Sequence, residues 1–99
     1  MAFNVVDHSS IDMSSRSRSE IVIQILEVAN ESDGDSATKT EIMYKVFLSY
    51  VQLKEYLVVL IDSDLLHYVG ETHTFKITEK GLRFLEAYNE IDPVLNSHI

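Results

Sequence analysis

The chain has 99 residues, of which 45% are hydrophobic and 24% charged, a composition typical of one globular domain. Its longest apolar runs are far shorter than the ~18 residues of a membrane span, and its first residues lack a secretion signal, so we expect a cytoplasmic protein without a membrane partner. The absence of cysteine excludes disulfides and thiolate chemistry, and a net charge of −8 disfavours polyanion partners unless the cations gather on one face.

The two ends of the chain lack the periodicity of its middle. Residues 1–15 are rich in serine and aspartate, which predicts a flexible arm, with a short strand near residues 3–6 as the alternative. Pro93 stops the last helical pattern, so residues 93–99 are predicted to form a tail. One folded domain is therefore expected over residues 16–92.

The first helix is marked by a capping box, in which Ser17 and Glu20 each bond the other residue's backbone N–H. Apolar residues then recur at helical spacing through Asn30. The predicted packing residues are Ile21, Val22, Ile25, Leu26 and Ala29. Residues 31–36 form an acidic turn with one glycine, which we interpret as a solvated loop because its carboxylates lack the spacing of an EF-hand calcium loop.

Two more capping boxes, Thr38 with Glu41 and Ser49 with Gln52, predict a short helix and a longer one that continues to Asp62. About three residues separate them, the spacing of a helix-turn-helix. The β-branched run 56–61 could alone form a buried strand, but the cap and the length favour a helix. Its predicted packing residues are Leu53, Leu57, Leu60 and Ile61, and its predicted outer residues are Val51, Gln52, Lys54, Glu55 and Asp62.

After Asp64 the apolar pattern changes from helical spacing to alternation, which predicts a β-hairpin over residues 65–77 with a loop at Gly70–His73. Thr78 can cap a last helix, whose predicted packing stripe is Gly81, Phe84, Leu85, Tyr88 and Ile91. A hairpin of this size needs support from the helices. The predicted fold is therefore mainly α with a small β-hairpin (α+β), a winged helix-turn-helix.

Particular sequence runs resemble a known family: Lys39-Thr40-x-Ile42-Met43-Tyr44, Leu48-Ser49-Tyr50 and Thr78-Glu79-Lys80-Gly81 with Phe84-Leu85. They are similar to the archaeal winged helix-turn-helix DNA-binding family, which includes the small 10a-type DNA-binding proteins and related predicted transcriptional regulators. The resemblance covers about residues 16–89. It implies double-stranded DNA as partner and a role as transcriptional regulator or nucleoid-associated protein.

The resemblance also implies roles for particular segments. Helix 49–62 would be the recognition helix near the major groove, and hairpin 65–77 would be the wing. Lys39 and Thr40 would lie beside a phosphate. The local excess of lysine adds Lys45 and Lys54 to the residues that the resemblance implies. The predicted DNA-binding residues are Lys39, Thr40, Lys45, Ser49, Tyr50, Gln52, Lys54, Thr72 and His73.

Family members dimerise through a long last helix, and we expect a homodimer. Here only about four helical turns fit before Pro93, which leaves a short helix pair with Phe84, Tyr88 and Ile91 as candidate dimer contacts. The predicted wing also departs from the family because Glu71 is acidic and only His73 could be positive.

Each DNA-binding residue also has a structural interpretation. The capping role of Gln52 requires no ligand, and the lysines can be ordinary solvated residues. Residues 38–55 nevertheless carry three lysines against two glutamates, in a chain whose net charge is −8. Exposed Val51 and Val58, with the acidic loop, support the alternative of a winged-helix protein–protein interaction module with little or no DNA binding. The four histidines lack metal-ligand spacing and no catalytic motif occurs, so neither cofactor nor enzyme activity is predicted.

Overall fold

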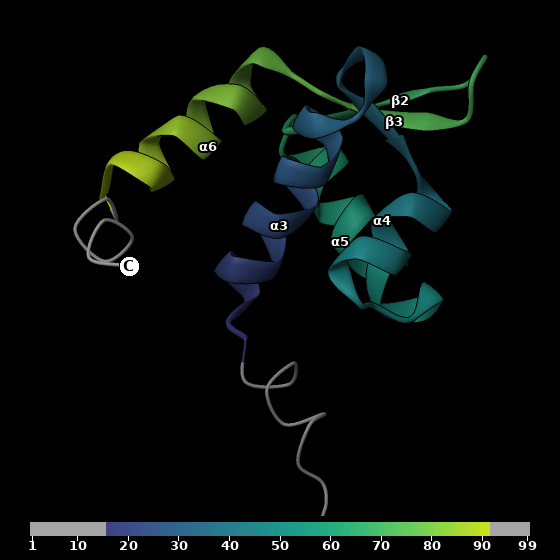
Figure 1. Ribbon diagram of the computed structural model, residues 1–99, viewed down its shortest axis with the longest axis horizontal. Coiled ribbons are helices and arrows are strands. Elements are labelled where there is room, and N and C mark those ends of the chain that lie inside the picture. Colours follow the sequence, from purple (N-terminus) through teal and green to yellow (C-terminus); the bar gives the residue numbers. More distant parts are fainter. Residues whose placement is uncertain (1–15, 92–99) are drawn as a thin grey trace, which may run out of the picture.

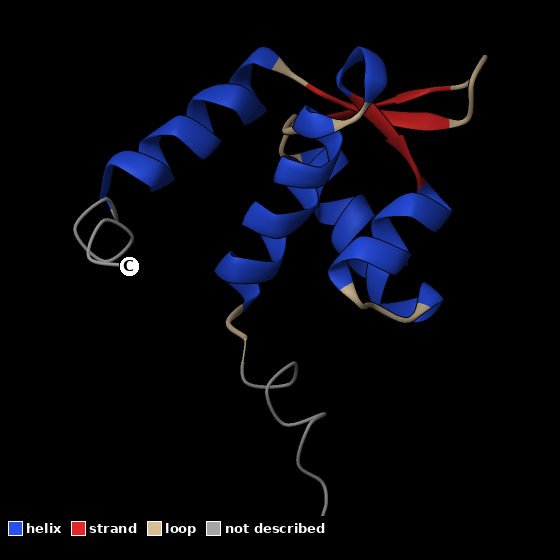
Figure 2. Ribbon diagram, viewed as in Figure 1, coloured by secondary structure: helices blue, strands red, loops and turns tan. Residues whose placement is uncertain are grey.

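The computed structural model describes residues 16–91, and the predicted arm and tail lie outside that range. Between these limits the chain forms four α-helices, a 3-10 turn and a three-stranded antiparallel sheet (Figures 1 and 2). In order these are α3 (Arg18–Glu31), η1 (Asp33–Asp35), β1 (Ser36–Thr38), α4 (Lys39–Val46), α5 (Tyr50–Asp62), β2 (Leu66–Val69), β3 (Thr74–Ile77) and α6 (Glu79–Ile91). The predicted α+β arrangement of helices and hairpin is confirmed.

Hydrogen bonds between near neighbours in the sequence define where the helices begin. Ser17 and Glu20 form the predicted capping box at α3, and Ser49 and Gln52 form the one at α5. The Thr38 hydroxyl accepts from the backbone N–H of residue 41 at 3.1 Å, so α4 begins as predicted. The carboxylate of residue 41 also accepts from the Ser32 hydroxyl at 2.8 Å and from the Lys45 ammonium at 3.1 Å.

The sheet contains a strand that the sequence did not predict. β1 pairs with β3, with Ala37 opposite Phe75, so the strand order is β1-β3-β2. The loop interpretation of residues 31–36 is therefore wrong at Ser36, which lies in β1. The predicted hairpin is confirmed as β2 and β3, with Leu66 opposite Ile77. Because β1 leads directly into α4, the sheet holds the start of α4 beside the hairpin.

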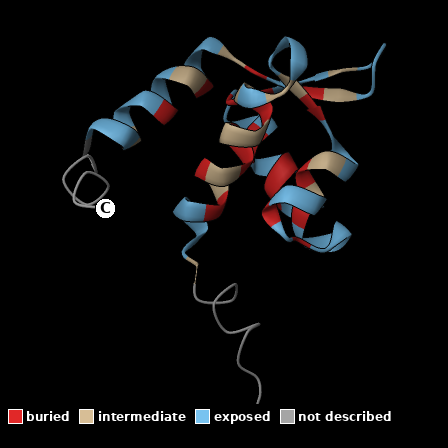
Figure 3. Cartoon of the chain, viewed as in Figure 1, coloured by how far each residue is buried: buried red, intermediate tan, exposed pale blue. Residues whose placement is uncertain are grey.

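The core lies where α3, α4 and α5 meet the sheet (Figure 3). Its most deeply buried large side chains are Ile25, Leu26, Ile42, Val46, Leu53, Leu60 and Leu66. α5 buries Tyr56 and leaves Ile61 39% exposed, so the predicted packing role of Ile61 is wrong. The buried residues of α5 are 53, 56, 57 and 60, so the predicted packing of Leu53, Leu57 and Leu60 is confirmed.

The last helix, α6, contacts α3 and β3 and then extends away from the other helices (Figure 1). Leu85 is buried, whereas Phe84, predicted to pack, is exposed. Gly81 is buried where a side chain would collide with the backbone carbonyl of Leu65, so the close approach of α6 to the sheet needs glycine. In the range that the structure describes, no helix is long and apolar enough to cross a bilayer.

Candidate nucleic-acid interface

One row of α5 points away from the core and meets solvent along its length. Residues 51, 55, 58 and 62 recur at i, i+4, i+7 and i+11 and so share one side of the helix. We call Val51, Glu55, Val58 and Asp62 the outward row. Val51 is 66% exposed and Val58 54% exposed, and both acidic residues are exposed as well. The exposed centre of α5 is thus apolar and acidic.

A basic flank lies along one side of the outward row. Tyr50 and Lys54 are one turn apart on α5, and the Lys39 ammonium nitrogen lies 4.9 Å from the centre of the Tyr50 ring, a cation–π contact. Lys39 is the first residue of α4, so this contact brings the starts of α4 and α5 together. Thr40 follows it and is also exposed. Three predicted DNA-binding residues, Lys39, Tyr50 and Lys54, therefore form one cluster.

The other side of the row carries a cation that the predicted site did not include. Gln52, Tyr56 and Val59 follow this second side at i, i+4 and i+7. The guanidinium carbon of Arg18 lies 5.3 Å from the centre of the Tyr56 ring. The capping box at α3 places Arg18 at the first helical position, but nothing local in the sequence places that position beside α5. Cations therefore lie on both sides of the outward row.

Ser49 and Gln52 are both engaged in the cap of α5. The Ser49 hydroxyl accepts from the Gln52 backbone N–H at 3.2 Å, and the Gln52 side-chain oxygen accepts from the Ser49 backbone N–H at 3.0 Å. A bidentate contact to adenine uses that same oxygen as well as the amide N–H groups. Only the amide donors of Gln52 remain fully available to a ligand.

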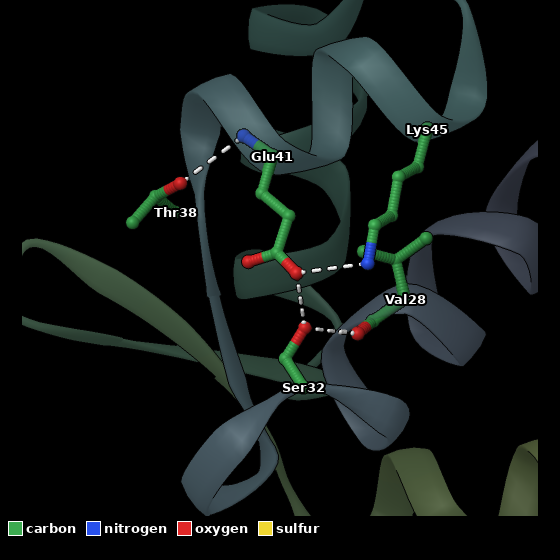
Figure 4. Close-up of polar contacts among 5 residues, drawn as sticks. All are labelled: Val28, Ser32, Thr38, Glu41 and Lys45. Atoms are coloured by element: carbon green, nitrogen blue, oxygen red, sulfur yellow. Dashed lines mark hydrogen bonds and ion pairs between the residues drawn. The ribbon is translucent and has the colours of Figure 1, made fainter.

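Lys45 faces a different part of the molecule from Lys39 and Lys54. Its ammonium group lies 3.1 Å from the Glu41 carboxylate, which also accepts from the Ser32 hydroxyl at 2.8 Å, and Figure 4 shows how these side chains point toward one another. The hydrogen bond from Ser32, followed by that from Lys45, lowers the pKa of Glu41. Lys45 is therefore balanced by a carboxylate and lies outside the cluster of Lys39 and Lys54.

Acidic residues gather at the end of α3 and in the turn that follows it. Burial, followed by the charge of nearby Glu31, raises the pKa of Glu27, and Asp33 and Asp35 lie in the turn that follows α3. The Arg16 guanidinium donates to the backbone carbonyl of Val46 at 2.8 Å, which joins the region before α3 to the end of α4. The acidic end of α3 therefore lies on the side of α4 that carries Lys45.

A family model described as winged helix-turn-helix matches residues 15–96. The chain belongs to this winged helix-turn-helix family. Its α4 and α5 form the helix-turn-helix, with α5 as the second helix, and the β2–β3 hairpin corresponds to the wing. The match supports DNA binding as the general activity, since the family is built on a DNA-binding fold. A comparison with curated proteins found no significant match.

The tip of the wing holds Thr72 and His73, both exposed. A ring nitrogen of His73 lies 2.9 Å from the Tyr68 hydroxyl, and the hydroxyls of Thr72 and Thr74 are 2.6 Å apart. Thr72 also lines an open polar pocket that Glu41 and Lys45 line from the other side. Within the described residues the wing tip thus offers polar groups but no permanently charged cation.

The turn of the helix-turn-helix presents an aromatic surface that was not predicted as part of the site. Phe47 has φ 61° and ψ 51° and is 63% exposed, and Tyr44 beside it on α4 is also exposed. This left-handed conformation costs about 1–2 kcal/mol for a residue other than glycine. A bulky side chain in this conformation is unusual and often marks a functional position.

The predicted dimer contacts lie on α6, away from α5. Phe84 is exposed, and Tyr88 is half-buried against the core. Ile91 is the last residue of α6. The portion of the chain that the structure describes contains no group of three or more His, Asp or Glu residues placed to hold a metal ion.

Proposed function

We propose that the protein is a DNA-binding transcriptional regulator or nucleoid-associated protein that inserts α5, as its recognition helix, into the major groove. The basic flank supports this proposal most directly, because Lys39 lies over the Tyr50 ring and Lys54 follows Tyr50 one turn along the proposed recognition helix. Phosphate contacts from such side chains position a helix in the groove, and base edges then meet its outer residues. The role is binding rather than catalysis, in the cytoplasm as the sequence predicts.

The remaining proposed contacts follow from position. Thr40 at the start of α4, with Ser49 and Tyr50 at the start of α5, would contact phosphates, since helix starts present free backbone N–H groups. Thr72 and His73 on the wing would lie near the minor groove or the adjacent backbone. Lys45 is the weakest of the predicted contacts, because Glu41 balances its charge.

A fluorescence anisotropy titration with random duplex DNA at about 50 mM salt tests the proposal. With about four phosphate contacts, the slope of log K against log salt should be near −3.6, from −0.9 per phosphate. The double substitution Lys39→Ala and Lys54→Ala should weaken binding to every duplex and reduce that slope by about 1.8.

Lys45→Ala is the matched control. It removes the same type of charge, but a charge that pairs with Glu41 at 3.1 Å. We expect its salt slope to stay near that of the unmodified protein. A slope reduced by about 0.9 in Lys45→Ala, half the change in the double variant, would show that overall charge, rather than the basic flank, controls binding.

The protein–protein interaction module remains the second candidate function. The net charge of −8 and the apolar, acidic outward row favour it, because a phosphate backbone would repel Glu55 and Asp62. Non-specific DNA binding typically has a Kd of ~10⁻⁴ to 10⁻⁶ M even at physiological salt. If no duplex binds at tens of micromolar protein in low salt, a protein partner becomes the better explanation.

We also propose a homodimer through α6, with Phe84, Tyr88 and Ile91 at the contact. The exposed ring of Phe84 on a helix that extends from the body supports it. Light scattering should give twice the monomer mass of 11.3 kDa, and Phe84→Ser should return the monomer mass. A monomer mass for the unmodified protein at high concentration would rule this contact out.

A further inference from the structure

We infer that the outward row of α5 reads thymine methyl groups, so that the protein prefers A·T base pairs. This inference rests on the proposed function, because it assigns what the recognition helix meets in the major groove. The row consists of two valines and two acidic residues, and none of these side chains can donate a hydrogen bond when the acids are ionised. The row therefore cannot make the usual contact to guanine, which requires donors from Arg or Lys.

The valines select the ligand chemistry. Val51 and Val58 expose 66% and 54% of their surface, and the thymine C5-methyl is the apolar group that base pairs present in the major groove. The two residues are seven positions apart on one side of the helix, about 10.5 Å along its axis. That length is roughly three base steps of 3.4 Å. Two methyl groups about three base pairs apart match this spacing.

Glu55 lies between the valines and adds a hydrogen-bond acceptor to the row. Its carboxylate can accept a hydrogen bond from an exocyclic amino group, which adenine and cytosine carry in the major groove. Glu55 can therefore bond an A·T pair or a G·C pair. An A·T pair presents both the methyl for a valine and the amino group for Glu55, whereas a G·C pair lacks the methyl. The preference for A·T pairs thus comes from the valines, and Glu55 is compatible with it.

Cations on both sides make this arrangement compatible with DNA. Lys54 and Lys39 lie on one side, and Arg18 lies on the other over Tyr56. In the groove these side chains would approach the phosphate backbones, while the apolar and acidic row would approach the bases. The charge pattern across α5 is therefore positive at the edges and uncharged or negative at the centre.

Deoxyuridine provides a direct test, because it keeps every hydrogen-bonding group of thymine and lacks only the methyl. Anisotropy titrations would compare an A·T-rich duplex with the same duplex carrying deoxyuridine at every thymine. Burial of one methyl-sized group changes affinity about fourfold. Loss of two contacts should therefore weaken binding about 15-fold.

Variants of the valines separate a direct contact from an effect on DNA shape. The double variant Val51→Ala with Val58→Ala should bind the thymine duplex and the deoxyuridine duplex with almost equal affinity. Val59→Ala is the matched control, since Val59 is 48% exposed on the same helix but lies outside the outward row. It should retain the preference for thymine. Thermal melts would confirm that all variants are folded, as expected for exposed positions.

Each outcome has a distinct meaning. If both duplexes bind with equal affinity, the methyl contact is wrong and DNA binding stands. If the thymine preference persists in Val51→Ala with Val58→Ala, the preference arises from DNA shape and the inference is again wrong. If neither duplex binds at tens of micromolar protein, the proposed function fails and this inference fails with it.

Discussion

Gln52 closes the capping box of α5 and also lies beside the row that we propose to meet DNA, so two substitutions can separate these roles. Gln52→Ala removes the oxygen that accepts from the Ser49 N–H at 3.0 Å but leaves the Ser49 hydroxyl bond at 3.2 Å intact. Loss of one exposed hydrogen bond should lower the free energy of unfolding by about 0.5–1 kcal/mol. For a domain of this size, the melting temperature should fall by roughly 2–8 °C.

Gln52→Glu should behave differently. The carboxylate retains the acceptor of the capping box and adds negative charge in the first turn of α5, where the structure places no acidic residue. A charge of this sign at a helix start stabilises by about 0.3–1 kcal/mol. The melting temperature should therefore equal or exceed that of the unmodified protein.

DNA binding should rank these proteins in another order. Gln52→Glu brings negative charge toward the phosphates and should weaken binding to every duplex. Gln52→Ala removes the amide donors without adding charge and should change base preference by about 1–3 kcal/mol. Circular dichroism melts and anisotropy on the same preparations give both rankings. Unchanged affinity in Gln52→Glu would remove this side chain from the DNA-facing surface, and a melting temperature below that of Gln52→Ala would refute the capping argument.

Two further substitutions test the packing of α6 and the Glu41 network. Gly81→Ala would place a methyl against the Leu65 carbonyl and 2.8 Å from a side-chain carbon of Ile77, so we expect a loss of about 1–3 kcal/mol in unfolding free energy, seen as a lower urea midpoint. An unchanged midpoint would mean that α6 shifts without cost. The hydrogen bond from the Ser32 hydroxyl lowers the pKa of Glu41 in the folded protein. The ionised carboxylate therefore stabilises the fold fully above the pKa of Glu in the unfolded chain, about 4.3. This stability is lost as the pH falls through the lower pKa of the folded protein. Glu41→Gln should therefore melt below the unmodified protein at pH 7, and the gap should narrow at acidic pH; a gap that does not change with pH would contradict the network.

The parts of the fold that depend on nearby residues were predictable. Ser17 with Glu20, and Ser49 with Gln52, are three residues apart, and each pair forms the capping box that its spacing predicts. The hairpin followed from alternation on both sides of a short loop containing Gly70. In each case the interacting groups lie within one turn or one loop of each other.

Contacts between distant residues were not predictable in the same way. β1 has three residues, too few for a periodic signal, and its Ala37 pairs with Phe75 from another part of the chain. Tyr56 rather than Ile61 is buried because the neighbouring elements determine which side of α5 is covered. The family resemblance is confirmed by the match to a winged helix-turn-helix model, whereas the role of α5 as recognition helix stays a proposal.

The sequence by itself determined the helix starts, the wing and the family, because these depend on local hydrogen bonds and on apolar spacing along one element. Only the tertiary structure decided which charges share a surface. It places Lys39 on Tyr50 and Arg18 on Tyr56 but turns Lys45 toward Glu41. A side chain's electrostatic partners depend on how separate elements pack, and that information is not contained in the spacing of charges along the chain.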